Sequence, residues 1–221
     1  YREDILPSEQ SVIDMIRVAT YVHQIPEAMD MIRDAHDKGY ETTVNLMAVS
    51  VVSDKQIDEA LEMLCTTEVD VIYLVDSFGS LYPEQIRCLA NKYLKYAEQS
   101  GKKIGIHAHN NQQLAYANTI EALTLGVSYL DSTIAGLGRG AGNCPTELLL
   151  GFLKNPKYNS RPILKCIRDC ILPFKEQYTW GYDIPYMLTG QLNMHPRSAI
   201  KFMDEKKTDY VELLDELTIT E

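Results

Sequence analysis

The stretch Val71-Ile-Tyr-Leu-Val75 decides the class of fold, because no charged or strongly polar residue interrupts it. A strand with one face in water alternates apolar and polar residues, so this run predicts a strand covered on both faces, as in a parallel sheet. Similar β-rich runs recur at intervals of about 30 residues, a spacing that suits βα units. They occupy residues 14–22, 42–47, 103–109 and 128–134.

Helix signals separate these runs. The capping box Ser53-Asp-Lys-Gln56 predicts one helix start, prolines predict three more, and glycines predict two helix ends. The prolines are Pro26, Pro83 and Pro145, the glycines are Gly39 and Gly126, and a further helix is expected over residues 113–125. The chain therefore predicts an α/β fold with five βα units. They fit a doubly wound open sheet or part of a (β/α)₈ TIM barrel, whose eight units need about 250 residues.

Residues 155–221 depart from this pattern. They contain five prolines, and their last helix signal lies near residues 210–217. We therefore expect two parts, an α/β domain over residues 1–154 and a C-terminal helical extension over residues 155–221.

The composition excludes several classes of protein. The chain has 221 residues, 45% apolar and 24% charged, which is the make-up of a globular domain rather than of a disordered segment. Its formal net charge of −10 repels phosphate backbones, so we expect no nucleic-acid partner. No apolar run approaches the roughly 20 residues of a membrane span, so we expect no membrane insertion.

The cysteines and the first residues are informative about the cellular compartment of the protein. Five cysteines without a CxxC pair predict reduced thiols and a cytoplasmic protein. Tyr1 is not a methionine, and residues 1–11 contain no signal or transit peptide, so we expect that the chain begins inside a longer sequence.

Polar residues follow three of the predicted strands, where α/β proteins place their sites. They are Asp76-Ser-Phe-Gly79, the pair His107 and His109, and a glycine-rich stretch over residues 136–143. The two histidines are two positions apart on a strand, so their side chains leave the same face. With carboxylate or amide oxygens nearby they suit a divalent metal ion, and the alternative is two packed or catalytic histidines without metal.

The glycine-rich stretch has two interpretations. It lacks the Lys-Ser/Thr of a phosphate-binding loop and does not have the dinucleotide spacing. It is either a flexible loop over the mouth of the sheet or a loop that brings backbone amides and Asn143 to a metal ion or oxyanion. Within it, Arg139 could hold a substrate carboxylate or be solvated. Cys144, just after it, could be reactive or a buried filler.

Asp76 and two tyrosines also have alternatives. Asp76 could orient a ligand, contact substrate, or cap the turn that precedes the next helix. Tyr182 and Tyr186 could donate a proton, or pack like other tyrosines in a chain that has 14 of them.

The segments 105–118 and 135–143 resemble the DRE-TIM metallolyases, which are HMG-CoA lyase-like enzymes. The resemblance lies in His107-Ala-His-Asn110, then Leu114-Ala-Tyr-Ala-Asn118, then Gly136-Leu-Gly-Arg-Gly-Ala-Gly-Asn143. It implies a (β/α)₈ barrel with a divalent ion, Mn²⁺ or Mg²⁺, at the mouth. His107 and His109 correspond to the family's metal-binding histidines, and Asn143 to an asparagine beside the metal.

The resemblance also assigns the strands. Asp76 matches the aspartate that ends the family's sixth strand, so the five strands would be the fourth to the eighth. The family's first strand carries an Arg-Asp pair with a metal ligand and a catalytic arginine, and no such strand is found here. We expect that the chain is a fragment or that its upstream part is absent.

Among the members, the 4-hydroxy-2-oxovalerate aldolases are most similar, since the short loop lacks the cysteine-bearing insertion of the CoA-thioester lyase. They imply cleavage of a 4-hydroxy-2-oxo acid to pyruvate and an aldehyde, with Tyr182 and Asp76 catalytic and with Gly138 and Arg139 binding substrate. One alternative is a Claisen-type acyltransferase of the isopropylmalate synthase kind, and another is a non-catalytic partial barrel that binds a partner. An aldehyde dehydrogenase partner and a homo-oligomer are further expectations.

Overall fold

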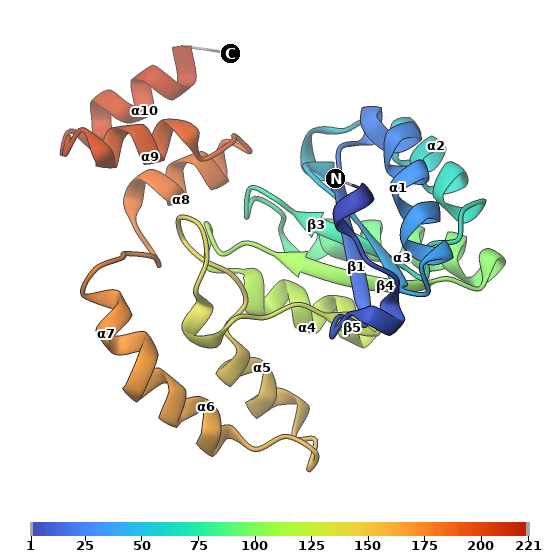
Figure 1. Cartoon of the computed structure of the whole chain (residues 1–221). Coiled ribbons are helices and arrows are strands. Elements are labelled where there is room, and N and C mark those ends of the chain that lie inside the picture. The colour runs from blue at the N-terminus through green and yellow to red at the C-terminus, as the bar shows by residue number, and fades with distance from the viewer. Residues whose placement is uncertain (1, 220–221) are drawn as a thin grey trace. The chain divides into compact units, whose positions relative to one another are not determined.

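The computed structural model describes residues 2–219, so Tyr1, Thr220 and Glu221 lie outside the described residues. Its centre is one sheet of five parallel strands in the order β1-β2-β3-β4-β5 (Figure 1). The strands are β1 (Met15–Thr20), β2 (Glu41–Leu46), β3 (Val71–Asp76), β4 (Lys103–Ala108) and β5 (Tyr129–Leu130). The prediction of a parallel α/β sheet is confirmed.

The chain forms two compact units. The sheet unit contains the chain up to Val75, with Glu84–Ile106 and Ala122–Leu130. The site unit contains Asp76–Pro83, His107–Glu121 and the chain from Asp131 onward. The strand-end residues singled out in the sequence therefore belong to the same unit as the C-terminal helices. The predicted boundary at residue 154 stays a prediction.

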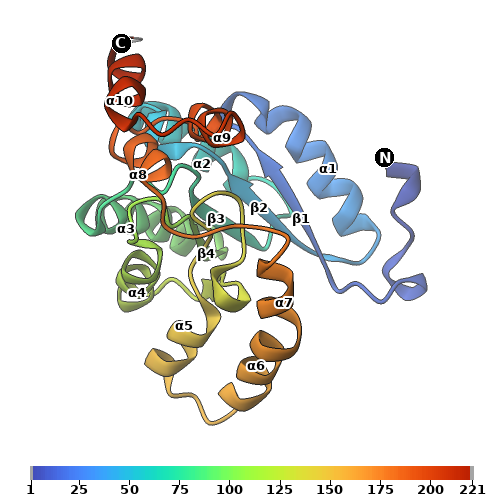
Figure 2. The ribbon, with the colours of Figure 1, turned by 90° about the vertical axis from the view of Figure 1, so that its left-hand side faces the viewer.

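Burial along the strands explains the sequence pattern. All six residues of β3 are buried, as its uninterrupted apolar run predicts. Strand β1 lies at the edge of the sheet beside β2 (Figure 2), and its residues alternate, with Val18 and Thr20 buried and Arg17 and Ala19 exposed. One face of β1 is therefore buried and the other exposed, whereas β3 is covered on both faces.

Three helices pack on the sheet: α1 (Ile25–Asp37), α2 (Asp54–Cys65) and α3 (Pro83–Ser100). Helix α2 begins with the predicted capping box, in which Gln56 N donates to Ser53 Oγ at 3.4 Å and Ser53 N donates to Gln56 Oε1 at 3.2 Å. Helix α1 ends two residues before Gly39, whose φ of +87° suits glycine. The predicted starts at Pro26 and Pro83 agree with the structure to within one residue.

The predicted fifth strand, over residues 128–134, is largely wrong, since only Tyr129 and Leu130 pair as a strand. The following residues pair elsewhere, because Thr133 N donates to Cys144 O at 3.0 Å and Thr133 forms a bridge with Pro145. Helix α4 (Ala115–Leu125) also starts later than residue 113, because Gln113 has a φ of +61° and Asn110 Oδ1 accepts from Ala115 N.

The end of the chain is helical, as predicted. Helices α5 (Thr146–Leu153), α6 (Ser160–Cys166) and α7 (Leu172–Lys175) follow the glycine-rich loop, with a π-helical segment, Ile167–Ile171, between the last two (Figure 2). Helices α8 (Ile184–Gln191), α9 (Arg197–Asp204) and α10 (Tyr210–Ile219) share a small core of Leu188, Phe202, Leu213 and Leu217. Among the described helices, none is long and apolar enough to cross a membrane.

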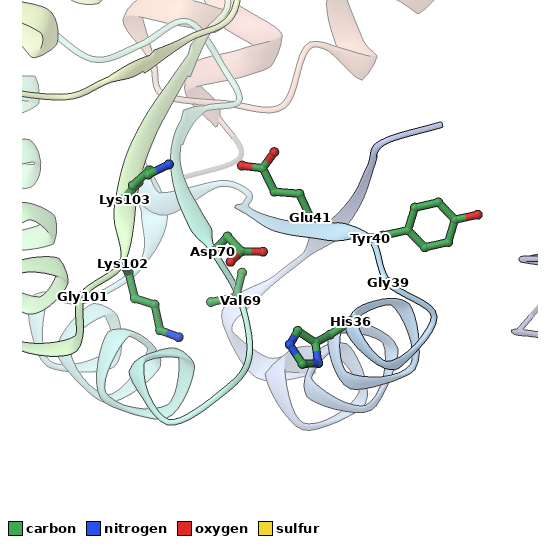
Figure 3. A pocket seen from close by; sticks show the side chains of 9 residues that line it. All are labelled: His36, Gly39, Tyr40, Glu41, Val69, Asp70, Gly101, Lys102 and Lys103. Atoms are coloured by element: carbon green, nitrogen blue, oxygen red, sulfur yellow. The ribbon is translucent and has the colours of Figure 1, made fainter. Parts of the chain in front are cut away.

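A cavity of about 470 Å³ lies in the sheet unit at the amino ends of β2, β3 and β4 (Figure 3). Three of the charged side chains that line it form hydrogen bonds with other groups of the protein. Glu41 accepts from Tyr129 Oη at 2.8 Å, Asp70 accepts from Thr42 N at 2.8 Å, and Lys102 Nζ donates to Thr67 O at 2.6 Å. These bonds tie strand beginnings together, and active sites of such folds lie at the opposite strand ends.

The ring of Tyr73 leaves no space for a side chain at position 105, which is a glycine. That ring is 2% exposed, and the Arg17 guanidinium lies 4.2 Å from its centroid. A Cβ on Gly105 of the neighbouring strand would lie 2.5 to 2.6 Å from the ring carbons of Tyr73. Glycine is therefore needed here for space.

We expect Gly105→Ala to lower the free energy of unfolding by about 1–3 kcal/mol, because the methyl group overpacks against Tyr73. Gly151→Ala is the control, since its added Cβ in helix α5 would meet no atom within 4 Å. That variant should gain up to about 1 kcal/mol from helix propensity. Urea unfolding measures both, and equal stability of the two variants would contradict the packing argument.

Candidate metal centre

His107 and His109 lie together at the end of β4. Their ring centroids are 5.1 Å apart and their planes are inclined at 82°, so both side chains leave the same face, as their spacing predicts. The Nδ1 atom of His107 lies 2.8 Å from Asp131 Oδ2. A carboxylate on one ring nitrogen fixes the ring and directs the other nitrogen, Nε2, away from it, an arrangement that is typical of histidines that bind metals.

His109 is a neutral imidazole. Burial lowers its pKa to about 4, and the nearby His107 and Arg139 act in the same direction. Its ring also hydrogen-bonds the backbone carbonyl of Gly142. A neutral ring that donates from one nitrogen presents a lone pair on the other.

Asn143 sits directly beside this pair. Residues His109 and Asn143 form an antiparallel bridge, and Asn110 N donates to Gly142 O at 2.9 Å. The Nδ2 atom of Asn143 donates to Leu137 O at 3.1 Å, whereas its Oδ1 atom is buried and accepts no hydrogen bond. A buried amide oxygen without a partner is costly, and a cation would satisfy it.

Gly138 makes room for this asparagine. A Cβ at Gly138 would lie 2.4 Å from Asn143 Nδ2. The glycine is thus needed for close approach of the loop to Asn143, and its role in binding substrate stays a prediction.

The residues fit a divalent ion in their chemistry. Two imidazole nitrogens and one amide oxygen suit ions of the Mn or Zn type, and both histidines have the hydrogen-bonded partners that orient metal ligands. Among residues 2–219, no three His, Cys, Asp or Glu side chains group as a metal site. The assignment of His107, His109 and Asn143 as metal ligands stays a prediction.

Asp76 holds the turn after β3. Its carboxylate accepts from Ser80 N at 3.0 Å and Leu81 N at 3.3 Å, and its backbone oxygen accepts from His109 N. Burial raises the pKa of Asp76 to about 7, although these backbone N–H groups oppose the shift. These contacts fit the role of Asp76 as a cap of the turn before the next helix, which was one of its three possible roles. Its catalytic role stays a prediction.

Arg139 and Tyr186 border the same loop. Arg139 Nη2 donates to Ser77 O at 3.0 Å, which ties the loop to the turn after β3. The ring of Tyr186 lies against Gly140, where an added Cβ would be 3.0 Å from it, and burial raises the pKa of Tyr186. Tyr182 is 59% exposed, so of the two candidate tyrosines Tyr186 is the one seated on the loop.

Sequence reasoning missed Asp131 and Trp180. Asp131 directly follows β5, as Asp76 ends β3, and this position was the signal that could have found it. Trp180 carried no local signal, since its contact with Ala135 spans 45 residues. Cys144 is fully buried and burial raises the pKa of its thiol, which favours its interpretation as a filler.

Comparison with known proteins identifies the family of this chain. The HMGL-like family matches residues 14–170. The chain belongs to this HMGL-like, or DRE-TIM, family, whose enzymes generally use a divalent metal ion.

Individual relatives are aldolases and a decarboxylase. A 4-hydroxy-2-oxovalerate aldolase of Pelotomaculum thermopropionicum is 34% identical over 155 residues, which are 70% of this chain and 45% of the relative. An oxaloacetate decarboxylase of Mycobacterium tuberculosis is 32% identical over 64% of this chain and 41% of its own length. These homologues are carbon–carbon lyases, and the chain spans less than half the length of each.

Solved structures share the fold. The N-terminal domain of a candidate aldolase from Bacteroides vulgatus has a TM-score of 0.77 and 29% identity, covering 91% of this chain and 70% of that one. HMG-CoA lyase of Bacillus subtilis has a TM-score of 0.63 and 19% identity, covering 75% of this chain and 63% of that one. The five strands thus match part of an HMGL-like TIM barrel.

Asp76 gives a testable pH dependence. Its pKa is about 7 in the folded protein against an ordinary 3.8, so between these values only the folded state keeps the proton. Compared with Asp76→Asn, the wild type should lose stability as the pH rises from about 4 to about 7, by at most about 1.4 kcal/mol per pH unit. Urea unfolding of both proteins in chelator measures this, and a difference that does not change with pH would count against it.

Proposed function

We propose that this chain is part of a metal-dependent aldolase, an enzyme that cleaves a 4-hydroxy-2-oxo acid to pyruvate and an aldehyde. The observation that carries the proposal is the unsatisfied, buried Oδ1 of Asn143 beside two oriented histidines. The aldolase relatives, at 34% identity, support this choice of reaction within the family.

We also propose that β1 to β5 are the fourth to the eighth strands of a (β/α)₈ barrel. The Bacteroides vulgatus and Bacillus subtilis structures support this, because the chain covers 70% and 63% of them. Under this proposal the remaining ligands of the ion come from strands outside the 221 residues.

Under this proposal, the residues of this chain would have the following roles in the reaction. Asp131 and the Gly142 carbonyl would hold His107 and His109 so that one nitrogen of each ring is left for a divalent ion, and Asn143 would add its amide oxygen. A divalent ion held there supplies Lewis-acid stabilisation of the negative charge that develops on the 2-oxo group. Arg139 binds the substrate carboxylate, for which a guanidinium is suited by its paired donors.

Cleavage of the C3–C4 bond needs a base that takes the 4-hydroxyl proton as the aldehyde leaves, and we assign that base to the strands outside the 221 residues. A tyrosine hydroxyl then gives a proton to C3 to complete pyruvate, and it regains a proton from that base. Burial raises the pKa of Tyr186, so its hydroxyl stays protonated at neutral pH. Its place against Gly140 favours it over Tyr182, the first candidate from the sequence. Asp76 supports the site by holding the turn to which Arg139 binds.

Decarboxylation of oxaloacetate is a second candidate. The Mycobacterium tuberculosis relative carries that name, and loss of CO₂ from a 2-oxo dicarboxylate also leaves negative charge on a pyruvate unit. The same ion and the same three ligands would serve both reactions.

We expect His107→Ala and His109→Ala to reduce pyruvate release to background, because each removes a proposed metal ligand. The assay measures pyruvate from 4-hydroxy-2-oxo acids and from oxaloacetate with Mn²⁺ or Mg²⁺. It uses the 221 residues and, where the reading frame continues upstream of Tyr1, the longer product. His36→Ala is the control, since its ring is 49% exposed on helix α1.

Each outcome of that assay decides between the functions. Full activity of both histidine variants would overturn the metal-dependent mechanism. Thiol release from acetyl-CoA with a 2-oxo acid, in place of cleavage, would favour the acyltransferase. Saturable Mn²⁺ binding without any turnover would favour the non-catalytic barrel.

Asp131→Asn should weaken Mn²⁺ binding about 10- to 100-fold, because the amide orients His107 less firmly than a carboxylate does. Calorimetric titration measures the dissociation constant. Asp37→Asn is the matched control, because its side chain is 69% exposed and lies on helix α1. Equal affinity of wild type and Asp131→Asn would remove Asp131 from the site.

A further inference from the structure

Ala135, at the start of the glycine-rich loop, has a backbone conformation that alanine rarely adopts. Its φ is 54° and its ψ is 27°, in the left-handed region. For residues other than glycine this region is disfavoured by contact between Cβ and the backbone, and the surroundings must hold it.

Two side chains hold Ala135 in place, one on each backbone group. The N–H of Ala135 donates to Glu147 Oε2 at 3.0 Å, and its carbonyl accepts from Trp180 Nε1 at 3.0 Å. Glu147 lies in helix α5, and Trp180 lies between α7 and α8. The three residues form what we call the Ala135 clamp.

The clamp lies where the two ends of the loop meet. Asn143 N donates to Gly136 O at 3.1 Å, so Asn143 is bonded to the residue directly after Ala135. Gly142 is packed so closely that a Cβ there would lie 2.1 Å from Gly136 O and 3.5 Å from Trp180 Cδ1. Any rotation of the peptide at Ala135 therefore moves Gly136, and with it the backbone of Asn143.

Trp180 is itself firmly seated. Lys175 Nζ lies 4.7 Å from the centre of its ring, and the Phe174 ring lies 6.1 Å from it, both from helix α7. The next residue bonds the loop again, since Gly181 N donates to Gly140 O at 3.1 Å. The segment after α7 thus contacts the loop near both Ala135 and Gly140.

We infer that Trp180 is a positioning residue for the metal ligand Asn143. Together with Glu147 it keeps Ala135 left-handed, and this sets the loop backbone from which the Asn143 side chain extends, next to His109 in the antiparallel bridge. The inference rests on the proposed metal site. Under this inference, the C-terminal segment that carries Trp180 helps to position Asn143 without contacting it directly.

The test is calorimetric titration of Mn²⁺ alone into four variants of the protein. Trp180→Phe keeps an aromatic ring but has no N–H, so its affinity should fall about tenfold or more, as for other residues that orient a ligand. Glycine adopts the left-handed region without strain, so the double variant Trp180→Phe with Ala135→Gly should recover most of that affinity. Glu147→Gln retains an acceptor oxygen and should bind nearly normally, whereas Glu147→Leu should bind weakly.

A role of Trp180 in stability alone would not give this pattern. Thermal unfolding of each variant is the control, and amide hydrogen exchange over residues 136–143 is the second readout. Exchange there should be faster in Trp180→Phe and slow again in the double variant.

The outcomes separate this inference from the function on which it rests. Wild-type affinity in Trp180→Phe, or weak binding that Ala135→Gly does not recover, would overturn the inference while the metal site stands. No Mn²⁺ binding by the wild-type 221 residues or by the longer product that includes the upstream strands would overturn the proposed metal site, and the positioning role with it.

Discussion

The antiparallel bridge between His109 and Asn143 is the constraint on which the candidate site depends. It joins the end of strand β4 to the end of the glycine-rich loop, two segments that helix α4 and strand β5 separate in the sequence. Through it a strand-end histidine and a loop asparagine come together. Asp131 then fixes His107, and the Gly142 carbonyl fixes His109, so that the backbone pairing and the orientation of the two side chains reinforce each other.

Much of this arrangement was predictable because it rests on short-range patterns. The apolar run at Val71 predicted a buried parallel strand, and the spacing of His107 and His109 predicted a shared face. The motif ending at Asn143 predicted the family, and the family match confirmed it. In each case the physical cause, strand periodicity or a local turn, lies within a few residues of the pattern.

What sequence reasoning missed depends on contacts between distant segments. The fifth strand is short because Thr133 pairs with Cys144, a partner that no periodicity reveals. Tyr182 and Tyr186 lie in one short segment, and only the fold shows that Tyr186 is the one against Gly140. Asp131 and Trp180 were missed for the same reason, since their roles come from the residues that they reach.

The position of Trp180 against the glycine-rich loop has a practical consequence. It is the one tryptophan in the sequence, and its indole N–H is bonded to the loop that carries Asn143. Indole emission is sensitive to the loss of such a bond and to the polarity around the ring. The intrinsic fluorescence of this protein therefore reports on one loop, so that a change in the contact between that loop and Trp180 can be followed in solution without any label.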